Sequence, residues 1–179
     1  IEAGGAFSAL QGKLGVSKLT EIVRQKEGWA RQAVHDFADG NAEAGLKAYA
    51  EKGLLTVSET RQGAKEALLN EWAKNGVKSP TNNLMFAGTN DEVSDLNTGA
   101  QKRRLLAGKL NQKSSLTKGQ TVFFEGDQVS FRRNSSLYGV KNGDFGTIEK
   151  IADGRLTVAL PSGKKTRFSL DEYKDIRLG

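Results

Sequence analysis

Clusters of basic side chains are the feature of this 179-residue sequence best suited to chemistry with a partner. Lysine and arginine cations neutralise the phosphates of nucleic acids, and the counterions released make such binding depend on salt. A solvated basic surface without a partner would carry the same residues, so both interpretations stay open at every cluster. The candidate phosphate contacts are Arg103 and Arg104 beside Lys102, Arg132 and Arg133, Lys141, and Lys164 and Lys165 with Arg167.

Four further side chains are candidates for binding. Thr89 stands three residues before Glu92, a spacing typical of a capping box at a helix start, and the amides of a helix start also suit a phosphate. Asn97 either reaches a nucleic acid or faces solvent. Tyr138 and Phe145 lie near a turn and could stack on bases, although we expect Phe145 to lie in a hydrophobic core.

The composition excludes several kinds of catalytic site. The chain has no cysteine, which removes thiol catalysis and zinc–thiolate sites and fits a reducing cytoplasm. Its one histidine, His35, cannot build a metal cluster, so we expect no metal site. No G-x-x-x-x-G-K-[ST] loop is present, so we expect the chain alone not to hydrolyse ATP. No run approaches the roughly 18 apolar residues of a membrane span.

Helical spacing of apolar residues dominates the first part of the chain, where glycines close most of the periodic segments. In the last of these segments we expect Val93, Leu96 and Ala100 to form a buried stripe. Two short apolar runs, "LTEIV" and "NNLMFAGT", predict strands that are buried in a sheet. The predicted helices are 3–14, 27–40, 41–53, 60–76 and 89–108, and the predicted strands are 19–23 and 82–89.

The period of the sequence changes from helical to alternating after residue 108. Apolar residues alternate in the runs 126–134, 155–161 and 166–170, as expected for strands with one buried face. The pairs Asn142-Gly143, Asp153-Gly154 and Ser162-Gly163 predict tight hairpin turns between them. We therefore predict an α+β chain with a helix-rich part over 1–108, a polar boundary near 108–120 and a five-stranded SH3-like barrel within 109–179.

The charge is divided unevenly between these two parts. Residues 1–108 hold 14 basic and 13 acidic side chains, whereas residues 109–179 hold 13 basic and 8 acidic ones. The surplus in the smaller part favours a polyanionic partner for the barrel, although charge alone is equally consistent with a basic, soluble surface.

Three blocks of this sequence carry a resemblance to a known family. They are "LTEIVRQKEGWARQAV" followed by "FADGNAEAGLKAYAEKG", then "LMFAGTNDEVSDLNTGAQ", then "GDQVSFRRNSSLYGVKNGDFGTIEKI". In this order they resemble the second lobe of RecD-like superfamily-one DNA helicases, and most of all the helicase half of conjugative relaxases. The resemblance implies part of the α/β lobe termed 2A over 1–108 and the SH3-like insertion termed 2B over 109–179.

The resemblance also implies roles for individual residues. Arg24 and Gln25 match the Arg-Gln pair of motif IV, and Arg24 would sense the γ-phosphate of ATP in the complete motor. Without the resemblance, Arg24 would be an ordinary arginine in a surface ion pair. Thr89 and Asn97 would contact single-stranded DNA. ATP and Mg²⁺ would bind only to the complete parent protein, a 5′-to-3′ helicase of the cytoplasm.

The partners implied are single-stranded DNA, the remainder of the helicase or relaxase chain, and the coupling protein of conjugative transfer, with no membrane. Ile1 is not an initiator methionine, and the missing ATP motifs indicate a segment of a longer protein. Two other interpretations stay open: a vestigial helicase lobe that docks the coupling protein, and a generic nucleic-acid-binding barrel of no motor origin.

Overall fold

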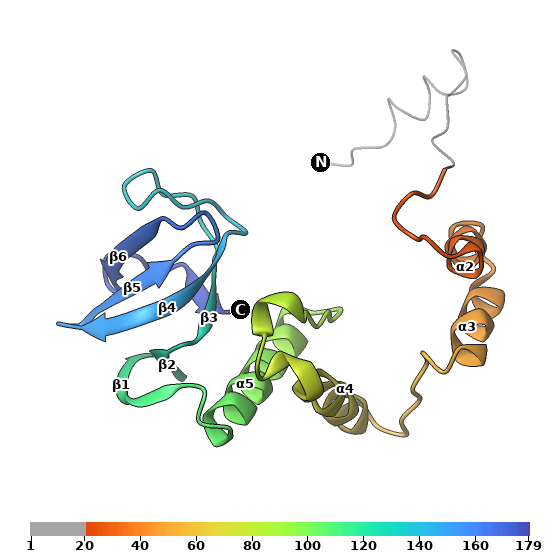
Figure 1. Ribbon diagram of the computed structural model, residues 1–179, viewed down its shortest axis with the longest axis horizontal. Helices are drawn as coiled ribbons and strands as arrows, with labels where there is room; N and C mark the ends of the chain where they lie inside the picture. Colours follow the sequence, from red (N-terminus) through yellow and green to blue (C-terminus); the bar gives the residue numbers. More distant parts are fainter. Residues whose placement is uncertain (1–20) are drawn as a thin grey trace, which may run out of the picture. The chain divides into compact units, whose positions relative to one another are not determined.

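The structure is a computed structural model and describes residues 21–179 (Figure 1). The chain divides into two compact units with the boundary between Val57 and Ser58. The predicted helix over 3–14 lies outside the described residues. All four other predicted helices form, and the alternating runs form an antiparallel sheet.

The described part of the first unit contains a pair of helices, α2 (Gly28–Ala38) and α3 (Ala42–Glu51). Gly40 has a φ of +83°, a left-handed conformation that glycine adopts without strain, and it reverses the chain between the two helices. The helices approach closely at Gly45, where a Cβ would lie 2.6 Å from the ring of Phe37. Trp29 meets Tyr49 edge to face, with ring centroids 5.3 Å apart.

The predicted strand over 19–23 is wrong in its described part. Residues 21–23 form no strand, and the Val23 side chain is largely exposed. A β-branched run becomes a strand only where another strand can take up its backbone hydrogen bonds, and none of the described residues pairs with it.

The second unit begins with α4 (Arg61–Gly76), the short 3₁₀ helix η1 (Pro80–Asn82) and α5 (Asn90–Leu106). Helices α4 and α5 share a small core of Leu69, Leu96 and Ala100. Gly99 permits this packing, because a Cβ there would lie 2.6 Å from a methyl carbon of Leu69. Val93, expected in the buried stripe of α5, is exposed, so the prediction was wrong at that position.

The predicted strand over 82–89 is also wrong. Residues 83–87 are free of helix and strand, although Trp72 Nε1 donates to the carbonyl of Asn83 at 2.8 Å. Met85 and Ala87 pack against the α4–α5 core, whereas Leu84 is 67% and Phe86 83% exposed. The alternation that predicted a strand is therefore present, but the described chain supplies no neighbouring strand to bond it.

The barrel consists of seven antiparallel strands in two sheets, two more than the five predicted. A two-stranded hairpin joins β1 to β2, and a five-stranded sheet has the order β6-β5-β4-β3-β7. The strands are β1 (Asn111–Lys118), β2 (Thr121–Glu125), β3 (Gln128–Phe131), β4 (Phe145–Ala152), β5 (Arg155–Ala159), β6 (Lys165–Ser169) and β7 (Ile176–Leu178).

The alternating residues fill the barrel core as predicted. Val129 and Phe131 on β3, Leu156 and Val158 on β5 and Phe168 on β6 are all fully buried. The polar segment 108–120 contains the whole of β1, where Leu116 packs against the core.

Two of the three predicted turns are tight hairpins. Asp153-Gly154, with φ of +54° and +69°, joins β4 directly to β5, and Ser162-Gly163 lies in the turn from β5 to β6. The prediction for Asn142-Gly143 was wrong, because this pair closes a longer β3–β4 loop, residues 132–144.

Helix α5 is fixed to the barrel by a polar joint. Asn97 Nδ2 donates to the carbonyl of Leu178 at 2.8 Å, and Gln101 Nε2 donates to the carbonyl of Val122 at 2.8 Å. Gln101 Nε2 also donates to the carboxylate of Asp127 at 2.6 Å. Helices α4 and α5 therefore belong to the same compact unit as the barrel.

Candidate nucleic-acid interface

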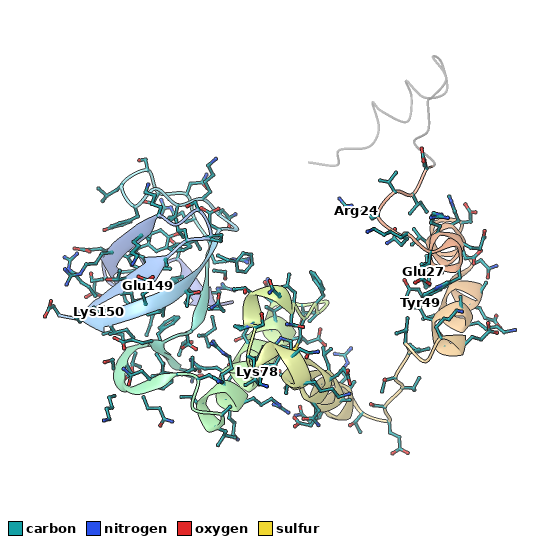
Figure 2. All side chains as sticks on the ribbon, viewed as in Figure 1. Arg24, Glu27, Tyr49, Lys78, Glu149 and Lys150 are labelled. Carbon is teal, nitrogen blue, oxygen red and sulfur yellow. The ribbon has the colours of Figure 1, made fainter. Side chains whose placement is uncertain are left out.

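Arg24, which is labelled in Figure 2, and Gln25 lie in the segment before α2. The Arg24 side chain is exposed, and Gln25 is half-buried. Arg31, on the first turn of α2, donates from Nη1 to the carbonyls of Gln25 at 3.1 Å and Lys26 at 2.7 Å. No pattern in the sequence predicts this contact, which ties the segment to α2 and leaves the Arg24 guanidinium at the surface.

Thr89 is the N-cap of α5, as its spacing from Glu92 predicts. Its Oγ1 accepts from the backbone N–H of Glu92 at 3.2 Å and lies 3.3 Å from a carboxylate oxygen of the same residue. Asp91 and Glu92 in the first turn already complement the positive end of the helix dipole. Thr89 thus has a structural role that is independent of any ligand.

Three candidate residues of α5 are engaged inside the unit. Arg103 forms an ion pair with Glu66 and donates to Asn70 at 2.8 Å, so it bridges α5 to α4. Arg104 Nη1 donates to the carbonyl of Gly126 at 2.9 Å. Asn97 is half-buried, and its side-chain amide is held by the barrel as described above.

The buried end of the α5 joint is electrostatically unusual. Burial lowers the pKa of Arg104, although nearby Asp127 opposes that shift. Burial also raises the pKa of Asp127, against hydrogen bonds from Phe124 and Gln101 and the charge of Arg104. Arg104 Nε finds no hydrogen-bond partner among the described residues. The Arg104 guanidinium therefore helps to join α5 to the barrel.

Two basic residues of β6 are paired within the barrel. Lys165 Nζ lies 2.6 Å from a carboxylate oxygen of Glu149 on β4, a residue marked in Figure 2. Arg167 Nη2 lies 3.0 Å from a carboxylate oxygen of Asp153. Both pairs are exposed, and such surface pairs hold their partners weakly, by about 0–1 kcal/mol.

The remaining basic candidates gather at one end of the barrel. Arg132, Arg133 and Lys141 lie on the β3–β4 loop and are exposed. Lys164, in the β5–β6 turn, places its Nζ so close to Gly139 of the loop that a Cβ on that glycine would collide with it. The nearest carboxylate to Arg133 is that of Asp175, at 3.9 Å. These four cations, Arg132, Arg133, Lys141 and Lys164, are here named the loop cations.

The two aromatic candidates differ from each other. Tyr138 packs its ring against Phe168, with centroids 5.5 Å apart, and against Tyr173, with centroids 5.9 Å apart, so neighbouring aromatic rings already contact it. Phe145 is 50% exposed, so its predicted place in the core was wrong. Gly146 occupies the inward position of β4, where a Cβ would lie 2.5 Å from Val158, and the pleat therefore turns Phe145 outward.

The described residues contain no cluster of three or more side chains suited to hold a metal ion. Within the same part of the chain, none of the helices combines the length and apolar character needed to span a bilayer.

The fold of this chain is similar to that of a solved helicase. Bacteroides Pif1, solved bound to single-stranded DNA, superposes with a TM-score of 0.52 at 16% identity, over 83% of this chain and 32% of that chain. Residues 1–60 match the family described as AAA domain. These findings confirm the α+β class.

Two relatives that match almost the whole chain are named conjugal transfer proteins. The chain is 31% identical over 176 residues to the conjugal transfer protein TraA of Rhizobium radiobacter and, to the same degree, to that of Agrobacterium fabrum. The match covers 97% of this chain and spans 16% of the length of each relative. The predicted resemblance to the helicase region of conjugative relaxases is confirmed.

Proposed function

We propose that this chain is part of an ATP-dependent 5′-to-3′ DNA helicase within a conjugative relaxase. The observation that carries the proposal is similarity to TraA proteins along 97% of the chain, in a fold shared with a helicase solved on single-stranded DNA. In this proposal residues 1–108 belong to lobe 2A and residues 109–179 form insertion 2B, in the cytoplasm. The remainder of the parent chain is then the first partner.

Arg24 is proposed to serve the ATP site of the parent protein. The residue lies within the 1–60 match to the AAA domain, and its guanidinium is exposed on a segment that Arg31 holds in place. A permanently charged, planar guanidinium can stabilise charge on a transferring phosphoryl group. Gln25 would help to position it, and ATP with Mg²⁺ would be held by parts of the parent outside this sequence.

The role of Arg24 is tested in the parent protein. Arg24→Ala should lower DNA-stimulated ATP hydrolysis by a factor on the order of 10³, as loss of an arginine finger does, while single-stranded DNA binding stays within twofold. Arg31→Ala should lower hydrolysis less, because it only positions the segment. Unchanged hydrolysis in Arg24→Ala would remove Arg24 from the ATP site.

Single-stranded DNA is proposed to contact the loop cations. They make no ion pair closer than the 3.9 Å contact of Arg133 within the described chain, whereas Arg103 and Arg104 are engaged by the fold. Lys165 and Arg167 are weaker candidates because acidic partners compete for them. Thr89 and Asn97 stay secondary candidates for the DNA backbone.

The DNA proposal is tested with a pair of charge-matched variants. Lys141→Gln with Lys164→Gln should weaken binding of labelled single-stranded DNA roughly tenfold at low salt, because two phosphate contacts are lost. Lys78→Gln with Lys113→Gln removes the same charge from exposed sites elsewhere and should leave affinity within about twofold. Equal losses in both variants would show non-specific attraction only.

A coupling protein is the alternative partner. If the chain binds no DNA even at low salt, a vestigial lobe that docks this protein replaces the motor proposal.

A further inference from the structure

The segment that carries Arg24 is bound by side chains from the start of α2. Besides the bonds from Arg31 described above, the indole N–H of Trp29 donates to the carboxylate of Glu27 at 2.5 Å. Glu27 is the N-cap of α2, yet its side chain accepts from no backbone N–H of the helix. An oxygen at an N-cap side chain ordinarily takes such a bond. Here the carboxylate binds Trp29 instead, which fixes the end of the segment next to α2.

Trp29 is also the side chain through which α3 reaches this segment. Its ring meets Tyr49 of α3 edge to face, with centroids 5.3 Å apart. The ammonium group of Lys52, the C-cap of α3, lies 5.8 Å from the centroid of the same ring. Figure 2 labels Glu27 and Tyr49, the residues on either side of Trp29 in this connection. The place of the segment therefore depends on both helices of the first unit.

The fold acts on Arg24 through the backbone of the segment. The Arg24 side chain is exposed, and residues 21–27 lie outside helices and strands. Bonds from side chains of α2 therefore fix this backbone, as a strand ladder would elsewhere. An error of about 1 Å in the place of a catalytic group can cost a factor on the order of 10² in rate. A guanidinium that must meet a phosphoryl group needs a segment that is fixed closely.

We propose that Trp29 is a positioning residue for Arg24, because it couples the Arg24 segment to α3 as well as to α2. The inference rests on the ATP-site role proposed for Arg24 above and adds a residue that acts on that site without touching ATP. The indole N–H of Trp29 holds Glu27, and the indole ring is held by α3.

The test removes one indole donor at a time from the parent protein. Trp29→Phe keeps an aromatic ring beside α3 and removes the N–H that binds Glu27. Because a misplaced Arg24 loses its contact with the transition state, kcat for DNA-stimulated ATP hydrolysis should fall roughly tenfold while KM for ATP stays within about twofold. Trp72→Phe is the matched control, since Trp72 Nε1 donates to the carbonyl of Asn83 at 2.8 Å in the second unit. The control should leave kcat within about twofold.

A double variant separates positioning from a general structural role. If Trp29 acts only through Arg24, Trp29→Phe should not lower hydrolysis further in an Arg24→Ala background. A further loss of similar size in that background, or an unchanged kcat in Trp29→Phe alone, would overturn the positioning role and leave the proposed function of Arg24 standing. Unchanged hydrolysis in Arg24→Ala would instead remove Arg24 from the ATP site, and the positioning role with it.

Backbone order in the 179-residue chain supplies a second measurement. NMR order parameters of the N–H groups at residues 24–27 should fall in Trp29→Phe from about 0.85, the value of rigid backbone, to below about 0.6. Those of α2 and α3 should keep their wild-type values. Low order at residues 24–27 in the wild-type chain, or a fall across both helices in the variant, would contradict the positioning role.

Discussion

At the scale of single residues, Asp127 is the charged group on which the joint between α5 and the barrel depends. It is 2% exposed, and both the Phe124 N–H at 2.8 Å and the Gln101 amide at 2.6 Å donate to the same oxygen, Oδ2. Asp127→Asn can keep both bonds with its carbonyl oxygen, so the free energy of unfolding should change by less than about 1 kcal/mol. Asp127→Ala leaves both donors without an acceptor, so the free energy of unfolding measured in urea should fall by about 2–4 kcal/mol. Equal effects of the two variants would contradict this account of the joint.

The same carboxyl group gives a pH dependence with a definite sign. Because burial raises its pKa, the folded state holds the proton of Asp127 more tightly than the unfolded state does. The charged carboxylate therefore costs stability above the folded-state pKa, and this cost fades as the pH falls toward the unfolded value of about 3.9. The unfolding free energy of Asp127→Asn minus that of the wild type should thus be larger at pH 7 than at pH 4. A difference that grows toward acid would contradict the direction of the shift.

Two phenylalanines test which face of each strand is buried. Phe131 is fully buried, and Phe131→Ala should lower the free energy of unfolding by about 3–5 kcal/mol. Phe145 faces outward, so Phe145→Ala should cost less than about 1 kcal/mol. Thermal unfolding measures the stability of both variants. A large loss of stability in Phe145→Ala would mean that Phe145 belongs to the core.

At the scale of elements, local pattern was sufficient wherever an element's partners are close in the sequence. The helices and the barrel runs were predictable because caps, glycine stops and hairpin turns act within a few residues. The runs 19–23 and 82–89 were not, because strand formation needs a neighbour that pattern does not supply. The basic clusters of the candidate site were visible in the sequence, but the residues that pair with them were not. Glu66, for example, pairs with Arg103 from 37 positions away.

The segment 83–87 has two faces whose energetic roles should differ. Met85 packs against the α4–α5 core, so Met85→Ala should cost about 2 kcal/mol. Phe86→Ser on the exposed face should leave stability within about 0.5 kcal/mol and lower the binding of a hydrophobic dye. Chemical unfolding and dye fluorescence are measured for both variants. Comparable losses of stability in Met85→Ala and Phe86→Ser would mean that both faces of the segment are covered.

At the scale of the whole molecule, the two compact units should separate under proteolysis. Residues 54–57 are exposed and free of helix or strand, and the unit boundary follows Val57. Exposed segments of this kind are preferred sites of cleavage. Brief digestion should cut between residues 53 and 60 and leave a fragment that starts near Ser58, as mass spectrometry would show. First cuts inside the barrel would contradict this division.

The measurement that tests the central claim most directly is the salt dependence of single-stranded DNA affinity. If all four loop cations contact phosphates, the slope of log K against log salt should be about −3, since each contact with a single strand contributes about −0.7. Replacing the four by glutamine should bring the slope close to zero. A slope near zero in the wild-type chain, or one that the replacement leaves unchanged, would contradict the claim that this end of the barrel binds DNA.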